Sequence, residues 1–226
     1  MTKVKSKVWL AWSSGKDSAF ALSELSKRED LEVAGLFTSV TAEFERVSMH
    51  STRMTLLQQQ AEALGLPLEI VLLPSPCSNE EYAKRMAKLL SKAKSAGISK
   101  MAFGDLYLDD VRAYRETMLA GTGLEPIFPL WKRPTRELAN EMIRYGLKAV
   151  LTSVDPSKLD GAFVGREFGE RLLADLPATV DPCGENGEFH TFVYAHPMFK
   201  FPIPIRRGAI VQRDGFFFAD VIPEAG

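Results

Sequence analysis

The sequence predicts an α/β protein in which a parallel sheet carries helices on both faces, followed by a smaller α+β part. Over the first part of the chain, short apolar runs alternate with amphipathic stretches, which is the pattern of strand and helix units in a parallel sheet. Three prolines surround Trp131, and beyond them the chain is richer in turn residues. We therefore expect one domain at residues 1–130 and a second at 131–226.

The elements of the first domain follow from apolar runs and from helix start and stop signals. Residues 8–12 are an unbroken apolar run, and a turn of small polar residues leads from them into a helical pattern. Ser51 is a candidate helix cap and Gly65 a candidate helix end, while Asp109 or Asp110 can open a later helix. We expect strands at 8–12, 32–39, 68–73, 101–103 and 127–128, and helices at 17–25, 51–64, 78–97 and 109–119.

The second domain has a different pattern, with short strands and many turns. The segment Arg213-Asp214-Gly215 separates two strand-like runs and predicts a terminal hairpin. We expect helices at 136–145 and near 168–173, and strands at 149–152, 189–194, 210–211 and 216–221.

Composition and charge exclude several classes of protein. With 28 Lys and Arg against 29 Asp and Glu, the net charge of -1 disfavours general nucleic-acid binding. The apolar runs are too short to span a membrane, and no signal-peptide pattern is present, so we expect a cytoplasmic protein. Cys77 and Cys183 stand far apart without metal-ligand spacing, which disfavours a zinc site or a disulfide.

The chemistry begins at residues 13–18, with the sequence Ser-Ser-Gly-Lys-Asp-Ser between a strand and a helix. A turn of small residues leaves backbone N–H groups free at the helix N-terminus, where they can bind phosphate. We expect Gly15 to allow close approach of an anion, Ser13 and Ser18 to add hydroxyl donors, and Lys16 to face the phosphate from an exposed loop. The pattern does not match the Walker loop, which disfavours a kinase or GTPase.

This loop resembles the S-G-G-K-D-S PP-loop of the N-type ATP pyrophosphatases, with Ser14 at the second glycine position. Further segments, spread over nearly the whole chain, resemble successive motifs of the diphthine–ammonia ligase family. They are Met49-His50, Gly104-Asp105, Gly123 to Pro126, Pro129 to Trp131, Gly165-Arg166 and Gly184 to Phe192. The last of these, with the pattern G-E-x-G-E-F/Y-x-T-F, is the most specific.

The resemblance implies a HUP-type domain, similar to adenine-nucleotide hydrolases, that binds ATP, and a family-specific C-terminal domain that binds the substrate. It implies that an amide is made from a carboxylate and ammonia through an acyl-adenylate, with Mg²⁺. Carried over to this sequence, the nucleotide-binding residues are Ser13, Ser14, Gly15, Lys16, Asp17, Ser18, His50, Gly104 and Asp105, with Asp17 and Asp105 also as metal ligands. The catalytic residues are Lys16, Asp17, Glu188 and His190, and the substrate-binding residues are Arg112, Glu185, Glu188 and His190.

Two departures from the family pattern concern the substrate. His190 stands where the archaeal and eukaryotic ligases usually carry Glu, and a Q-R-x-R segment of the family is replaced near residues 110–116. The chain therefore resembles a divergent, bacterial-type branch. Bacteria do not make diphthamide, so we expect the ATP chemistry to be kept while the acid changes.

The residues outside the loop allow structural readings as well. Gly104 and Asp105 follow a strand at the carboxyl edge of the sheet, where ligand sites form. By contrast, Asp109 or Asp110 can simply cap a helix, Arg112 and Arg115 can be solvated helix positions, and His50 can be structural.

Two residues of the 184–192 segment are placed to act together. Glu188 and His190, two apart on an expected strand, should share a face and could bind substrate or accept a proton from ammonium. An ordinary turn with surface charges is the alternative reading. Cys183 lies nearby, but we expect a buried structural thiol because no group that would lower its pKa is evident.

The resemblance thus implies an enzyme that joins a carboxylate to free ammonia and consumes ATP. A PP-loop enzyme that modifies tRNA is one alternative, although the neutral net charge and the missing C-x-x-C oppose it. A nucleotide-binding sensor without turnover is the other, and the clustered Glu185, Glu188 and His190 oppose that. We expect no glutaminase activity, because about 100 residues beyond the ATP domain leave no room for a glutaminase module.

Overall fold

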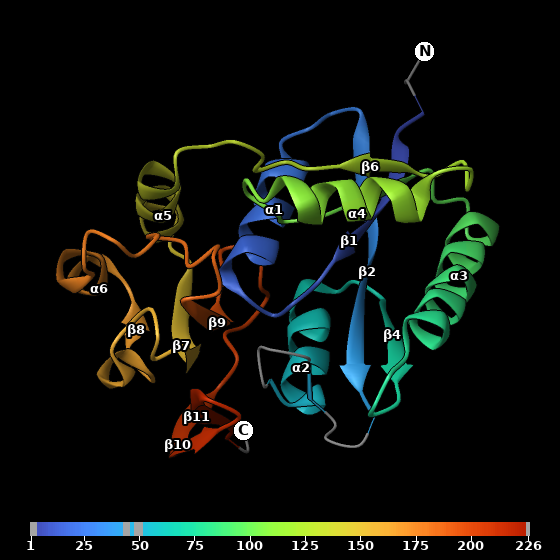
Figure 1. Ribbon diagram of the computed structural model, residues 1–226. Coiled ribbons are helices and arrows are strands. Elements are labelled where there is room, and N and C mark those ends of the chain that lie inside the picture. Colours follow the sequence, from blue (N-terminus) through green and yellow to red (C-terminus); the bar gives the residue numbers. More distant parts are fainter. Residues whose placement is uncertain (1–3, 43–45, 48–51, 225–226) are drawn as a thin grey trace.

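The computed structural model describes residues 4–42, 46–47 and 52–224 (Figure 1). The helices are α1 (Lys16–Ser26), α2 (Met54–Leu64), α3 (Asn79–Ser95), α4 (Asp109–Leu119), α5 (Thr135–Arg144) and α6 (Glu170–Asp175), with a 3-10 turn at Gly161–Phe163. The strands of the first sheet are β1 (Ser6–Ala11), β2 (Leu31–Thr41), β3 (Arg46–Val47), β4 (Leu68–Leu73), β5 (Lys100–Ala102) and β6 (Glu125–Ile127). Those of the second are β7 (Lys148–Val154), β8 (Glu167–Phe168), β9 (Phe189–Ala195), β10 (Ile205–Arg213) and β11 (Phe216–Pro223).

The first sheet contains five parallel strands in the order β4, β2, β1, β5, β6, and β3 adds a short antiparallel pair to β2. Side chains alternate between its faces, as expected of a sheet covered on both sides. Val8 and Leu10 of β1 pack in the core that contains α1 and α2, whereas Trp9 packs in the core that contains α3 and α4. The predicted HUP-like parallel sheet is thus confirmed.

The second sheet is smaller and antiparallel, with the order β10, β11, β7, β8 and with β9 also paired to β7. Its β9 packs against α1, so the two parts of the chain meet beside the loop that joins β1 to α1 (Figure 1). Leu151 and Val193 of this sheet belong to the same hydrophobic core as Leu10. The smaller α+β part expected at the C-terminus is therefore present, and it shares a core with the first sheet.

Several local signals act as the sequence predicted. Gly65 ends α2 in the left-handed conformation with φ of 68°, and the Ser78 side chain accepts a hydrogen bond from the Glu81 N–H at the start of α3. The terminal hairpin turns at Asp214 and Gly215, which both have positive φ, as the two-residue turn between twisted strands requires. Ser51 lies outside the described residues.

Two expectations are corrected by the structure. Phe168 is not helical: it pairs with Ala149 in β8, and α6 begins only at Glu170. The apolar spacing of this short segment fits either state, and pairing with β7 decides between them. Leu108 stands at the cap position of α4, so Asp109 and Asp110 occupy its first turn instead of capping it.

Over the described residues, no helix is both long and apolar enough to cross a bilayer.

Candidate active site

A cavity of about 520 Å³ opens where β1, β2 and β5 end. Its walls come from the loop between β1 and α1, from the start of α4 with the residues before it, and from residues 184–190. Ligands of parallel α/β sheets bind at this edge. Seven predicted site residues line the cavity, namely Ser13, Asp17, Ser18, Gly104, Asp105, Glu185 and His190. Ser14, Gly15, Lys16, Arg112 and Glu188 do not line it, and His50 lies outside the described residues.

The loop between β1 and α1 is held by a residue in an unusual conformation. Ser14 has φ of 70°, a left-handed backbone that favours glycine, and it is completely buried. Its hydroxyl lies 2.8 Å from the hydroxyl of Thr52, and its carbonyl accepts hydrogen bonds from the N–H of Val193 and from the side chain of Gln60. The structure thus explains why the similar PP-loops carry glycine here, and how serine is tolerated.

The start of α1 faces the cavity with hydroxyl groups beside it. The N-cap residue of α1 is Gly15, which has no side chain to cap the helix, and the first helical N–H, that of Lys16, donates to the Thr191 hydroxyl at 3.1 Å. Ser13 and Ser18 both line the cavity, and their hydroxyl oxygens lie 3.2 Å apart. The Ser18 hydroxyl also donates to the Gly15 carbonyl. A helix N-terminus that borders a cavity and is flanked by hydroxyls suits an anion such as phosphate.

Lys16 points away from the cavity, so the expectation that it faces phosphate from an exposed loop is wrong. Its side chain is 2% exposed, and Nζ donates to the Asp17 carboxylate at 2.8 and 3.0 Å and to the Cys183 carbonyl. The rings of Phe168 and Phe189 lie within 6 Å of Nζ. Burial by itself lowers the pKa of Lys16, but its attraction to Asp17 leaves that pKa above the ordinary value. Through these buried hydrogen bonds, the charged Lys16 side chain links the loop to the C-terminal part of the chain.

The wall that follows β5 carries an ion pair. Gly104 lies against the loop so closely that an added Cβ would come within 3.1 Å of the backbone of Asp17 and Ser18. The next residue, Asp105, accepts a hydrogen bond from Nε of Arg115 at 3.5 Å. Burial raises the pKa of Asp105, and Arg115 offsets part of that rise. Asp105 and Asp17 both line the cavity.

The opposite wall is built by carboxylates that accept backbone hydrogen bonds. Asp181 accepts from the Glu185 N–H at 2.9 Å, which closes the turn. Glu185 reaches across the cavity, and its Oε1 accepts from the Leu106 N–H at 2.7 Å. Burial raises the pKa of Glu185 to about 7, so this carboxyl group titrates near neutral pH.

Glu188 and His190 do not both face the cavity, contrary to the expected shared face. Glu188 is 3% exposed, and its Oε1 accepts from the Asp181 N–H and from the Asn186 amide, so it braces the turn. It precedes β9, which begins at Phe189, so the strand alternation does not extend to it. His190 does line the cavity. Burial, with a contribution from Lys16, lowers the pKa of His190 to about 4, and its imidazole is neutral at pH 7.

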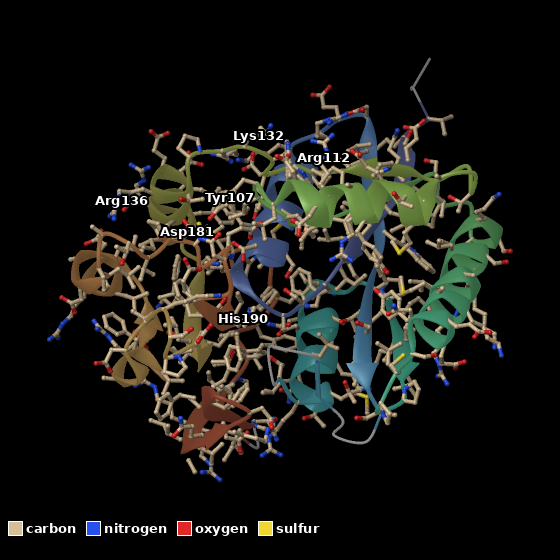
Figure 2. The ribbon with its side chains drawn as sticks, viewed as in Figure 1. Tyr107, Arg112, Lys132, Arg136, Asp181 and His190 are labelled. Atoms are coloured by element: carbon tan, nitrogen blue, oxygen red, sulfur yellow. The ribbon has the colours of Figure 1, made fainter. Side chains whose placement is uncertain are left out.

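Of two arginines on α4, the predicted Arg112 does not line the cavity and Arg115 does. Arg112 stacks on Phe128 and Trp131 and pairs with Glu116, at the upper edge of α4 and apart from His190 in Figure 2. Arg115, three residues on, lines the cavity. Helical spacing from the apolar Val111, one turn earlier, was the signal that could have singled it out.

Two family models together match most of the chain. The diphthamide synthase N-terminal domain matches residues 6–126, and the diphthamide synthase C-terminal domain matches residues 134–219. The diphthine–ammonia ligase of Danio rerio is 30% identical over 176 residues, which cover 71% of this chain and 69% of that protein. The diphthine–ammonia ligase of Rattus norvegicus is 26% identical over 180 residues, covering 77% and 67%.

The HUP-like sheet, the first turn of α1 at the cavity and these matches define the class of protein, an ATP-dependent ligase. The chain belongs to the diphthamide synthase family.

Proposed function

We propose that this protein joins a carboxylate to ammonia through an acyl-adenylate and releases AMP and pyrophosphate. The observation that carries the proposal is the arrangement of the cavity. Asp17 and Ser18 in the first turn of α1, with Ser13 before it, face the same space as Glu185 and His190 of the C-terminal part. An anion-binding helix end and a titrating carboxyl group across one cavity suit phosphate chemistry coupled to proton transfer. The names of the relatives, diphthine–ammonia ligases, support amidation with ammonia.

The residues present fit an ATP–magnesium complex. The N–H groups at the start of α1 would hold phosphate oxygens, and the carboxylates of Asp17 and Asp105 would face a cation bound to them. Among the described residues, no three His, Cys, Asp or Glu side chains gather into a metal site. That fits Mg²⁺, which is usually held by one or two carboxylates together with phosphate oxygens and water. When bound, Mg²⁺ supplies positive charge that offsets the charge of the phosphates.

In the first step a carboxylate oxygen of the acid attacks the α-phosphorus of ATP, and pyrophosphate leaves. This chain contributes positioning: Ser14 holds the loop in the conformation that exposes the α1 N-terminus, and Lys16 ties that loop to the C-terminal part. The Ser13 and Ser18 hydroxyls would donate to phosphate oxygens as charge builds on them.

In the second step the nitrogen of ammonia attacks the acyl carbon, the bond to AMP breaks, and one proton leaves the nitrogen. Glu185 is suited to take that proton, because its pKa of about 7 makes it an effective base near neutral pH. The neutral imidazole of His190 would hold the reacting groups by hydrogen bonding and would not repel ammonium.

The nitrogen donor in this proposal is free ammonia. Cys183 is 1% exposed, its thiol donates to the Thr135 carbonyl, and burial raises its pKa well above the ordinary value. A thiol in that state is a poor nucleophile, which argues against hydrolysis of glutamine at this residue. We place the ATP site in residues 1–130 and recognition of the acid in residues 131–226.

The proposal is tested with ¹⁵N-ammonium, ATP, Mg²⁺ and a fractionated cell extract, with a diphthine-bearing protein as one defined acid. We expect one AMP for each ¹⁵N-labelled amide, measured by chromatography and mass spectrometry. ADP and phosphate in place of AMP would contradict adenylate chemistry. Binding of ATP without any AMP, with every acid supplied, would favour a nucleotide sensor instead.

A further inference from the structure

The cavity has one permanent positive charge on its wall. Among the described residues that line it, Arg115 is the only lysine or arginine. Lys16, the cation of the loop pattern, is enclosed by Asp17, the Cys183 carbonyl and two phenylalanine rings. Among the lining side chains, Arg115 is therefore the one whose charge would attract a ligand with several negative charges.

The Arg115 guanidinium lies against an aromatic ring, and most of its N–H donors remain available to a ligand. Its guanidinium lies 5.0 Å from the centre of the Phe103 ring, and its Nε donates to Asp105 over a long distance of 3.5 Å. Its side chain is 27% exposed. A guanidinium has five N–H donors, and one long bond uses only one of them.

Arg115 also stands close to the phosphate-binding end of α1. Its partner Asp105 follows Gly104, and Gly104 packs directly on the backbone of Asp17 and Ser18. On α4, Val111 and Arg115 are one turn apart, and both face the cavity. The guanidinium and the helix N-terminus thus border the same space from two sides.

We propose that Arg115 binds the phosphate chain of ATP, opposite the N-terminus of α1, and supplies the positive charge that the loop pattern assigns to Lys16. This inference rests on the proposed function, because it takes the nucleotide as the ligand of the cavity. Arginine suits this task, since its planar fork matches phosphate oxygens in a bidentate contact.

The test is calorimetric binding of α,β-methylene-ATP with Mg²⁺ to wild type, Arg115→Met and Arg115→Lys. Arg133→Met is a matched control: Arg133 is 28% exposed, pairs with Glu141 and lies over Phe20, away from the cavity. We expect Arg115→Met to weaken binding about tenfold or more, Arg115→Lys to recover part of the loss, and Arg133→Met to bind within about twofold of wild type. Circular dichroism and thermal melting show whether each variant is folded.

Three outcomes overturn the inference: a folded Arg115→Met that binds the analogue as wild type does, an equal loss in Arg133→Met, or an equal loss of adenosine binding, which would place Arg115 at the nucleoside. If Arg115→Met does not fold, Arg115→Lys with unchanged affinity for both the analogue and inorganic pyrophosphate also contradicts it. A wild-type protein that binds no nucleotide at all would instead contradict the proposed function.

Discussion

Two of the walls of the cavity are held in place by different kinds of bond. The loop of residues 13–18 is fixed mainly by backbone carbonyls and hydroxyls, which do not titrate, and by the buried Lys16 ammonium, whose pKa lies above its ordinary value. The wall of residues 181–190 is fixed by carboxylates, and one of them, Glu185, titrates near pH 7. We infer that the first wall is a constant platform for the nucleotide, whereas the second wall responds to pH.

The largest effect is expected from Ser14→Val, which breaks the first wall. A β-branched residue at φ of 70° is strained, and the variant loses the bond to Thr52. We expect the free energy of unfolding to fall by about 3 kcal/mol, measured by urea unfolding, with loss of nucleotide binding. Ser14→Gly is the control: glycine accepts this backbone, so a similar loss in that variant would show that φ is not the cause.

The next largest effect is expected from Lys16→Met, which removes the ammonium that hydrogen-bonds to both the loop and the Cys183 carbonyl. The variant leaves the Asp17 carboxylate and the Cys183 carbonyl without their buried partner. Because Asp17 is partly exposed, we expect a loss of about 2 kcal/mol in the free energy of unfolding. Nucleotide affinity, corrected for the folded fraction, should fall less than in Arg115→Met. A stable Lys16→Met protein that no longer binds nucleotide would restore the direct phosphate role.

A smaller effect is expected from Glu185→Gln, which removes the titrating group of the second wall. The folded pKa of about 7 lies above the ordinary value of 4.5, so the folded state holds a proton that the unfolded chain releases. Stability from Glu185 is thus present below pH 4.5 and lost as pH rises through 7. Unfolding measured from pH 5 to 8 should show a flatter profile in the variant than in wild type. Parallel profiles for the two proteins would contradict this assignment.

The smallest effect on the fold is expected from His190→Ala. The side chain lines the cavity, and its imidazole is neutral at pH 7. We expect unchanged binding of α,β-methylene-ATP and amide formation slower by about tenfold to a hundredfold, measured by ¹⁵N incorporation. Glu188→Gln is the matched control in the same segment, because Glu188 does not line the cavity. An equal loss of rate in both variants would point to a role in folding of the turn.

Much of the fold could be predicted from the sequence because its signals are local. The strand at Ser6–Ala11, the stop at Gly65 and the Asp214-Gly215 turn each depend on residues close in the chain. The direction of Lys16 could not be predicted, because its partner Cys183 is 167 residues away. Arg112 and Arg115 differ only in rotation around one helix, and that rotation is set by how α4 packs.

We propose that the loop wall serves adenylate formation and that the wall of residues 181–190 serves the reaction with ammonia. Exchange of labelled pyrophosphate into ATP without ammonium tests these separate roles most directly. The assay uses the acid, or the extract fraction, that supports AMP formation, and it compares wild type with His190→Ala. If an acyl-adenylate forms on the loop side before ammonia reacts, both proteins will show exchange, and only wild type will make amide at full rate once ammonium is added. Exchange that requires ammonium, or that is lost in His190→Ala, would contradict the account.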